Sequence, residues 1–182
     1  MKVGLFTVLF SQLPWESALD KVKEFGIEAV EVGTGNYPGN AHCNPDLLLE
    51  DSALRKRFKQ AAIDRGLTIS ALSCQGNPLH PNKEFAQKNH ETWRKTVELA
   101  SLLEIPVVCH FSGCPGDSPE AKNPNWVTCA WPNEYSEVLK WQWEEVAIPY
   151  WQKEAEFAKL DNQAEEILKM DRKSTRLNSS HR

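Results

Sequence analysis

Short apolar runs of strand length alternate along this chain with longer segments that have the periodicity of amphipathic helices. The apolar runs are Val3–Phe10, Ile27–Val32, Leu67–Ser73 and Val107–Phe111. The helical segments are Pro14–Phe25, Asn44–Arg65 with a second start at Ser52, Lys83–Leu103, and Glu134–Leu160 with a predicted kink at Pro149. Apolar strands separated by helices indicate a parallel β-sheet with both faces buried.

A doubly wound open sheet and a (β/α)8 barrel share this alternation. The Gly-x-Gly-x-x-Gly loop of dinucleotide-binding sheets does not follow the first strand, which disfavours that version of the open sheet. The turns that enter strands are as short as Gly26 and Gly66, whereas the segments that leave strands are long and polar. The sequence therefore predicts an α/β fold that is the N-terminal half of a (β/α)8 TIM barrel, with about four βα units and its chemistry at the carboxyl ends of the strands.

Composition narrows the possible partners. The chain has 25 Asp and Glu residues against 21 Lys and Arg, a balance that argues against a nucleic-acid surface. No apolar run approaches the length of a membrane span, so no membrane partner is expected. Five cysteines at wide spacings are typical of reduced thiols, which predicts a cytoplasmic protein.

The segments that follow the strands carry a resemblance to a known family. The strings EVGTGNYPGNAH, LSCQGNPLHP, FSGCPGDSP and NPNWVTCAWP resemble segments of the sugar phosphate isomerase/epimerase family, the xylose-isomerase-like TIM barrels. The likeness covers roughly residues 1–160, which we interpret as one partial barrel domain. It says little about which sugar is the substrate.

The resemblance implies a metal-assisted reaction. Members of the family bind a divalent metal (Mn, Mg, Co or Zn) through Glu, Asp, His and Glu at the ends of later barrel strands. The metal polarises a carbonyl of a small sugar or sugar phosphate while acidic groups move a proton between neighbouring carbons. None of those ligands maps onto a residue of this chain, so no metal and no turnover are expected for it alone. The resemblance also allows a homo-oligomer.

Five side chains are predicted to line the substrate side of the pocket, and the catalytic residues stay unassigned. Glu31 lies late in the second strand, where a carboxylate can accept from a sugar hydroxyl; a buried ion pair or an outward-facing Glu is the alternative. Asn77 and His80 follow the third strand and could instead make loop hydrogen bonds. His110 ends the fourth strand and could be a core histidine. Trp126 lies in the long loop and either stacks on a sugar ring or packs as a lid.

A cluster of Cys109, His110, Cys114 and Cys129 suggests zinc at first sight. The spacing lacks the paired Cys-x-x-Cys of structural zinc sites. Strand alternation also directs Cys109 and His110 to opposite faces of the sheet. The sequence therefore predicts no metal site among these residues.

The last part of the chain differs from the rest. Residues 161–170 have the polarity of a helical extension, and residues 171–182 look like translated short-read sequencing adapter. This tail has four basic residues among Ser, Thr and Asn, with Leu177 as its single apolar side chain, and cannot form a core face. We therefore expect the natural sequence to end at or before Met170 and to be an N-terminal fragment.

Two other functions fit parts of the pattern. A natural half-barrel could act as a binding or assembly module that dimerises to close its sheet, because closure removes exposed strand edges. A metal-dependent endonuclease of the same superfamily is less favoured, since it needs a basic surface to face DNA.

Deletion of residues 171–182 should leave the thermal midpoint of the chain unchanged, because a tail without an apolar face adds no burial on folding. Differential scanning calorimetry of the full and shortened chains measures this. A clear drop in the midpoint of the shortened chain would show that the tail belongs to the fold.

Overall fold

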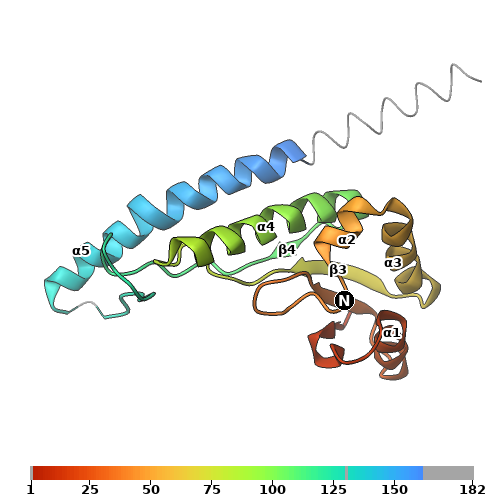
Figure 1. Ribbon diagram of the computed structural model, residues 1–182. Coiled ribbons are helices and arrows are strands. Elements are labelled where there is room, and N and C mark those ends of the chain that lie inside the picture. The colour runs from red at the N-terminus through yellow and green to blue at the C-terminus, as the bar shows by residue number, and fades with distance from the viewer. Residues whose placement is uncertain (1, 130, 162–182) are drawn as a thin grey trace, which may run out of the picture.

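Four parallel strands form one sheet in the computed structural model, which describes residues 2–129 and 131–161 (Figure 1). The strands are β1 Gly4–Phe6, β2 Ala29–Gly33, β3 Thr68–Ser73 and β4 Val108–Cys109. They lie side by side in chain order, β1-β2-β3-β4. A doubly wound sheet would reverse its strand order at a switch point, whereas a barrel adds each strand beside the last. The predicted parallel α/β arrangement is confirmed.

Side-chain caps fix where three of the helices begin. The helices before the long loop are α1 Trp15–Glu24, α2 Pro45–Glu50, α3 Ser52–Asp64 and α4 Lys83–Leu103. The side-chain oxygens of Asn44, Asp51 and Asn82 accept hydrogen bonds from backbone N–H groups in the first turns of α2, α3 and α4. These groups would otherwise have no partner within the helix, so capping selects the starting residue. The bounds of α4 are the ones that the sequence predicts.

Two predicted strands are too long. Val3–Phe10 is a strand only as far as Phe6, and Thr7–Phe10 form the 3₁₀ helix η1. An apolar run cannot distinguish a strand from a buried helical turn by periodicity alone. Val107–Phe111 pairs only over Val108 and Cys109, which lie opposite the last two residues of β3.

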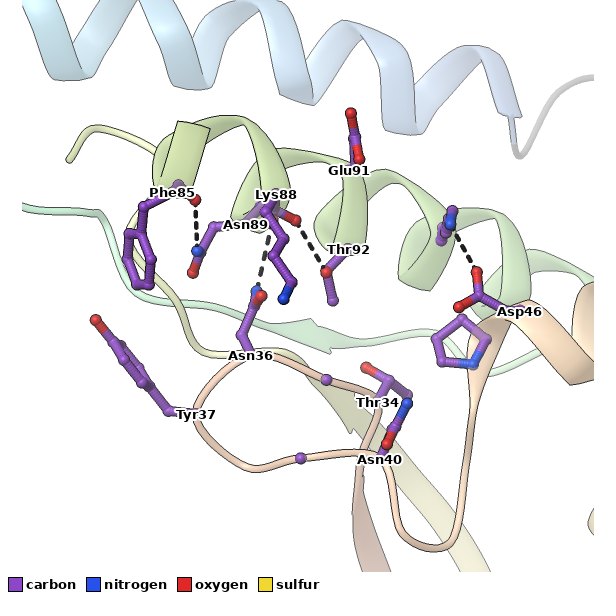
Figure 2. A pocket seen from close by; sticks show the side chains of 14 residues that line it. Thr34, Asn36, Tyr37, Asn40, Asp46, Phe85, Lys88, Asn89, Glu91 and Thr92 are labelled. Carbon is purple, nitrogen blue, oxygen red and sulfur yellow. Dashed lines mark hydrogen bonds and ion pairs between the residues drawn. The ribbon is translucent and has the colours of Figure 1, made fainter. Parts of the chain in front are cut away.

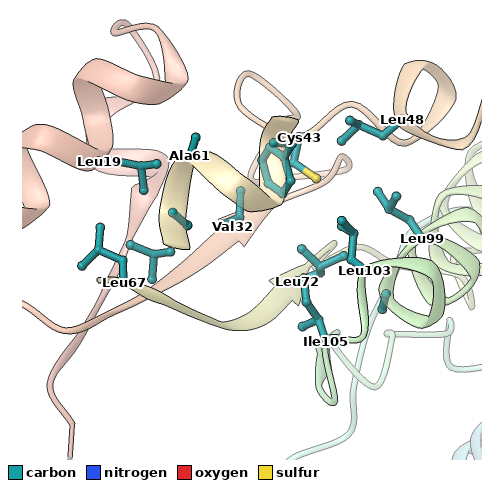
Figure 3. Packing of buried hydrophobic residues seen from close by; sticks show 14 of the residues in the cluster. Leu19, Val32, Cys43, Leu48, Ala61, Leu67, Leu72, Leu99, Leu103 and Ile105 are labelled. Atoms are coloured by element: carbon teal, nitrogen blue, oxygen red, sulfur yellow. The ribbon is translucent and has the colours of Figure 1, made fainter. Parts of the chain in front are cut away.

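One face of the sheet packs against the helices and forms the hydrophobic core (Figure 3). Val30, Val32 and Leu72 are fully buried on this face. The helices contribute Leu19 and Val22 from α1, Phe58 and Ala61 from α3, and Leu99 and Leu103 from α4. Burial of each large aliphatic side chain contributes about 1.5–3 kcal/mol, which makes this layer the main source of stability.

The residues between these core positions have a different character. Ala29, Glu31 and Gly33 alternate with the valines along β2, and Ala71 and Ser73 lie in register with Glu31 and Gly33 on β3. Since side chains alternate along a strand, they project from the face opposite the helices. The residues on this second face are small or polar toward the carboxyl ends of the strands, whereas those on the first face are aliphatic.

A long helical segment follows the 110–132 loop and lies along α4 (Figure 1). It consists of α5 Asn133–Trp141, the π-helical turn η2 Gln142–Ala147, and helical residues 148–161. The π turn lies just before Pro149, whose ring cannot donate a backbone hydrogen bond and crowds the preceding turn.

The π turn also corrects one sequence interpretation. The periodicity predicts Trp143 in a core stripe with Leu139, Val146, Tyr150 and Phe157, yet Trp143 is 44% exposed. Gln142, Ala147 and Glu154 are the fully buried residues of this segment instead. A π turn holds more residues than an α turn, so it rotates the buried face away from the phase that a 3.6-residue period predicts.

A buried ion pair fastens the last helical residues to α4. Arg94 Nε and Nη2 each donate to a carboxylate oxygen of Glu154 at 3.0 Å, and the guanidinium lies 4.3 Å from the ring centre of Phe157. The Glu154 side chain is 0% exposed, whereas that of Arg94 is 34% exposed. Water can therefore solvate the Arg94 guanidinium if Glu154 is removed, but it cannot reach the Glu154 carboxylate if Arg94 is removed.

Arg94→Met should lower the free energy of unfolding by about 3 kcal/mol, because it leaves a buried carboxylate without its counter-charge. Glu154→Gln should lower it by about 1 kcal/mol, since the remaining guanidinium reaches solvent. Urea denaturation of the chain measures both values. Lys140→Met breaks the exposed pair with Glu144 and should change stability by less than about 0.5 kcal/mol. Equal losses for the Arg94 and Glu154 variants would contradict the asymmetry.

Candidate functional site

The strands β2, β3 and β4 end in register, so the loops that follow them share one edge of the sheet. Gly33 lies in register with Ser73, and Ser73 lies in register with Cys109. In parallel α/β folds, ligands bind beyond this carboxyl edge. The loops 34–44, 74–82 and 110–132 therefore form the candidate site.

Glu31 is hydrogen-bonded to Ser73 of the third strand and, through Ser73, connected to Gln75 of the following loop. The Ser73 hydroxyl donates a hydrogen bond to Glu31 Oε1, and Gln75 Nε2 donates to Ser73 Oγ at 3.1 Å. These three residues are named the strand-end row. Gln75 Oε1 is buried and has no hydrogen-bond partner in the described part of the chain. An unpaired buried acceptor is costly, and it is the kind of group that a ligand hydroxyl would satisfy.

Sequence reasoning missed Ser73 and Gln75. Their signal was their place at the end of the third apolar run, in step with Glu31 at the end of the second. Glu31 lies in register with Ala71 of β3 and is hydrogen-bonded to Ser73, and its substrate-binding role stays a prediction.

Asn77 binds the neighbouring loop with both ends of its amide. Its Nδ2 donates to Cys114 O at 2.8 Å, and its Oδ1 accepts from Cys114 N at 2.7 Å. Its own backbone N–H donates to Asn89 Oδ1 of α4 at 2.9 Å. A Cβ on Gly76 would lie 2.2 Å from the same Asn89 oxygen, which requires glycine there. In this structure Asn77 makes the loop hydrogen bonds that were the alternative to substrate contact.

His80 lies where the third loop enters α4. Its Nδ1 accepts a hydrogen bond from Asn82 N at 2.9 Å, and its ring packs edge-on against Phe85 with ring centres 4.9 Å apart. Asn82 in turn caps α4. The contacts of His80 thus help to fix the start of α4. Its role in substrate binding stays a prediction.

His110 faces the helices, not the strand-end row. Its ring lies 5.4 Å from each of the rings of Trp93 and Trp151, measured between ring centres. Nδ1 donates to Phe111 O at 2.6 Å, so the proton lies on that nitrogen in the neutral ring. Burial lowers the pKa of His110 below its ordinary value. These contacts are those of a histidine in an aromatic cluster.

Trp126 contacts its own 110–132 loop and the π-helical turn η2. Its Nε1 donates to Gly113 O at 2.8 Å, and its ring stacks on Trp143 at 5.1 Å between ring centres. The buried Gln142 joins the loop to the helix by donating to Gly116 O at 3.0 Å and accepting from Val127 N at 3.1 Å. One face of the Trp126 ring is therefore occupied by another side chain.

A cavity of about 510 Å³ lies on the helix side of the same edge, between the 34–40 loop and α4 (Figure 2). Its walls include Asn36, Tyr37, Phe85, Lys88, Thr92 and Lys95. None of the five residues predicted from the sequence lines it.

Metal ligands do not converge within the described ranges. Among residues 2–129 and 131–161, no group of three or more His, Cys, Asp or Glu side chains could hold a metal ion. The described residues therefore do not fit a divalent metal by themselves. Within the same ranges no helix is both long and apolar enough to cross a membrane.

Known proteins resemble this chain in sequence, and others resemble it in fold. Residues 19–159 match the family model described as Xylose isomerase-like TIM barrel. Uncharacterized protein YfiH of Bacillus subtilis (strain 168) is 41% identical over 155 residues, which cover 84% of this chain and 49% of that protein.

Two solved structures resemble the fold at low sequence identity. A putative xylose isomerase from Rhodospirillum rubrum ATCC 11170 has a TM-score of 0.59 and 16% identity, over 88% of this chain and 51% of that one. A D-psicose 3-epimerase, solved in the presence of D-fructose, has a TM-score of 0.51 and 12% identity, over 89% of this chain and 50% of that one.

The chain thus spans about half the length of the proteins that it matches. Together with the parallel sheet in chain order, this confirms the predicted partial barrel. The chain belongs to the xylose isomerase-like TIM-barrel family.

Proposed function

We propose that this chain forms the substrate-side wall of a sugar or sugar-phosphate isomerase or epimerase, which moves a proton between adjacent carbons of a ketose or aldose. The observation that carries the proposal is the strand-end row at the carboxyl edge of β2 and β3. A D-psicose 3-epimerase crystallised with D-fructose shares the fold, which supports a sugar as the substrate class.

The strand-end row suits a polyhydroxy ligand. Glu31 is half-buried, and its carboxylate accepts from Ser73, which holds the carboxylate in one orientation and leaves further lone pairs for a substrate hydroxyl. Gln75 Oε1 offers a second acceptor that no described protein group uses. Two acceptors in one hydrogen-bonded row favour a ligand with hydroxyl donors over an apolar one.

A metal site would require a longer protein than this chain. A divalent ion such as Mn, Mg, Co or Zn would polarise the sugar carbonyl, and its ligands are proposed to lie outside the described residues, which do not supply three. Since the chain covers about half of its relatives, turnover is proposed for a protein with a full ring of strands and not for these 182 residues alone.

Proton transfer beside a carbonyl exchanges a carbon-bound hydrogen with solvent. A longer protein that contains this chain within a full ring of strands should therefore incorporate deuterium into a ketose in D₂O, measured by proton NMR, whereas the 182-residue chain should not. Glu31→Gln should lower kcat/KM about 10- to 100-fold, because a charged acceptor is lost. Ser73→Ala should lower it less, since the carboxylate remains.

Glu28→Gln serves as the matched control, because Glu28 is exposed and precedes β2 at the other end of the sheet. It should leave kcat/KM unchanged. The proposal fails if no ketose or aldose gains deuterium, and the role of Glu31 fails if its variant behaves like the Glu28 variant.

A further inference from the structure

The cavity beside α4 is separate from the strand-end row. One wall is the 34–40 loop, and the other is the first half of α4, which covers the helix side of the sheet (Figure 2). The strand-end row projects from the opposite face. A volume of about 510 Å³ lies within the range of small-molecule sites.

The loop that forms the cavity is held in one shape. Asn36 has the left-handed backbone angle φ of 55°, and its Nδ2 donates to Cys74 O at 2.8 Å. Tyr37 N donates to Gln75 O at 3.0 Å. Gly35 has φ of 141°, and a Cβ there would lie 2.7 Å from Thr92 Cγ2 of α4. These contacts hold the loop against β3 and α4, so the cavity is already formed without a ligand.

Two lysines and two acidic residues line the cavity, Lys88 and Lys95 with Asp46 and Glu91. Lys95 Nζ lies 2.6 Å from Asp46 Oδ1, which neutralises that end. The Lys88 side chain points into the space between α4 and the loop, whereas Glu91 points away from it (Figure 2). No ion pair to Lys88 occurs within residues 2–129 and 131–161. The Glu91 carboxylate accepts a hydrogen bond from Gln87 Nε2 at 3.0 Å, so the Lys88 ammonium group faces the cavity with no ion-pair partner among the described residues.

Aromatic side chains lie at the other end of the cavity. Tyr37 and Phe85 both line it, from the loop and from the first turn of α4. Their rings offer an apolar surface for the carbon skeleton of a ligand, next to a cation that favours a negative group.

We propose that this cavity binds a small organic anion, with its phosphate or carboxylate on Lys88 and its carbon skeleton against Tyr37 and Phe85. The site lies outside the proposed reaction centre and does not rest on the proposed function. Phosphate and carboxylate are both anions whose oxygens accept hydrogen bonds from an ammonium group such as that of Lys88. The ligands chosen below distinguish between them.

Isothermal titration calorimetry of the full 182-residue chain tests the site with inorganic phosphate, D-fructose 6-phosphate, D-gluconate and uncharged D-fructose. Saturable binding is expected for at least one of the sugar-derived anions and not for D-fructose. Lys88→Gln should weaken that binding about 10- to 100-fold, because a charge-assisted contact is lost. A preference for D-fructose 6-phosphate identifies phosphate as the group bound, and a preference for D-gluconate identifies carboxylate.

Lys83→Gln is the matched control, since Lys83 is an exposed lysine of the same helix that does not line the cavity. It should bind like the unaltered chain. The proposal is overturned if D-fructose binds as well as the anions, if no anion binds, or if the two lysine variants lose the same affinity. Thermal midpoints of both variants, expected to be unchanged, exclude a loss through misfolding.

Discussion

The pairing of β2 with β3 fixes which side chains meet at the edge of the sheet. Its register shifts between Val30 and Glu31, so that Ser70 becomes the extra residue of a bulge and its hydroxyl donates to Val30 O at 3.0 Å. Ile69 and Leu72 stand three residues apart, yet both pack toward the helices. Simple alternation cannot place them on one face, and the bulge resolves this conflict. It thereby puts Ser73 beside Glu31.

Buried amides then connect the loops that leave this edge. Asn89 is 3% exposed, donates to Phe85 O at 2.7 Å and accepts from Asn77 N, so α4 and the third loop share one polar centre. Asn77 extends the connection to Cys114 in the fourth loop. Each of these hydrogen bonds is modest, but an unpaired buried amide would be costly, which makes the set rigid once it is formed.

Sequence reasoning succeeded where local physics decides and failed where tertiary contacts do. The bounds of α4 follow from its cap and its apolar period, and Glu31 lies within the predicted second strand. The partners of Glu31 depend on a bulge, and the exposure of Trp143 depends on a π turn, neither of which a two- or 3.6-residue period encodes. The position of His110 among tryptophans likewise requires the packing of a helix distant in sequence.

The 34–37 segment is a wall shared by both sides of the edge. It lines the cavity with Asn36 and Tyr37, and it bonds to the backbone of residues 73–75 through Thr34 N, Asn36 Nδ2 and Tyr37 N. The side chains of Ser73 and Gln75 belong to the strand-end row. A ligand that moved this segment would have to strain or break those hydrogen bonds, and the cost would reduce its binding free energy. The same hydrogen bonds therefore hold the cavity wall and the carboxyl end of β3 in one arrangement.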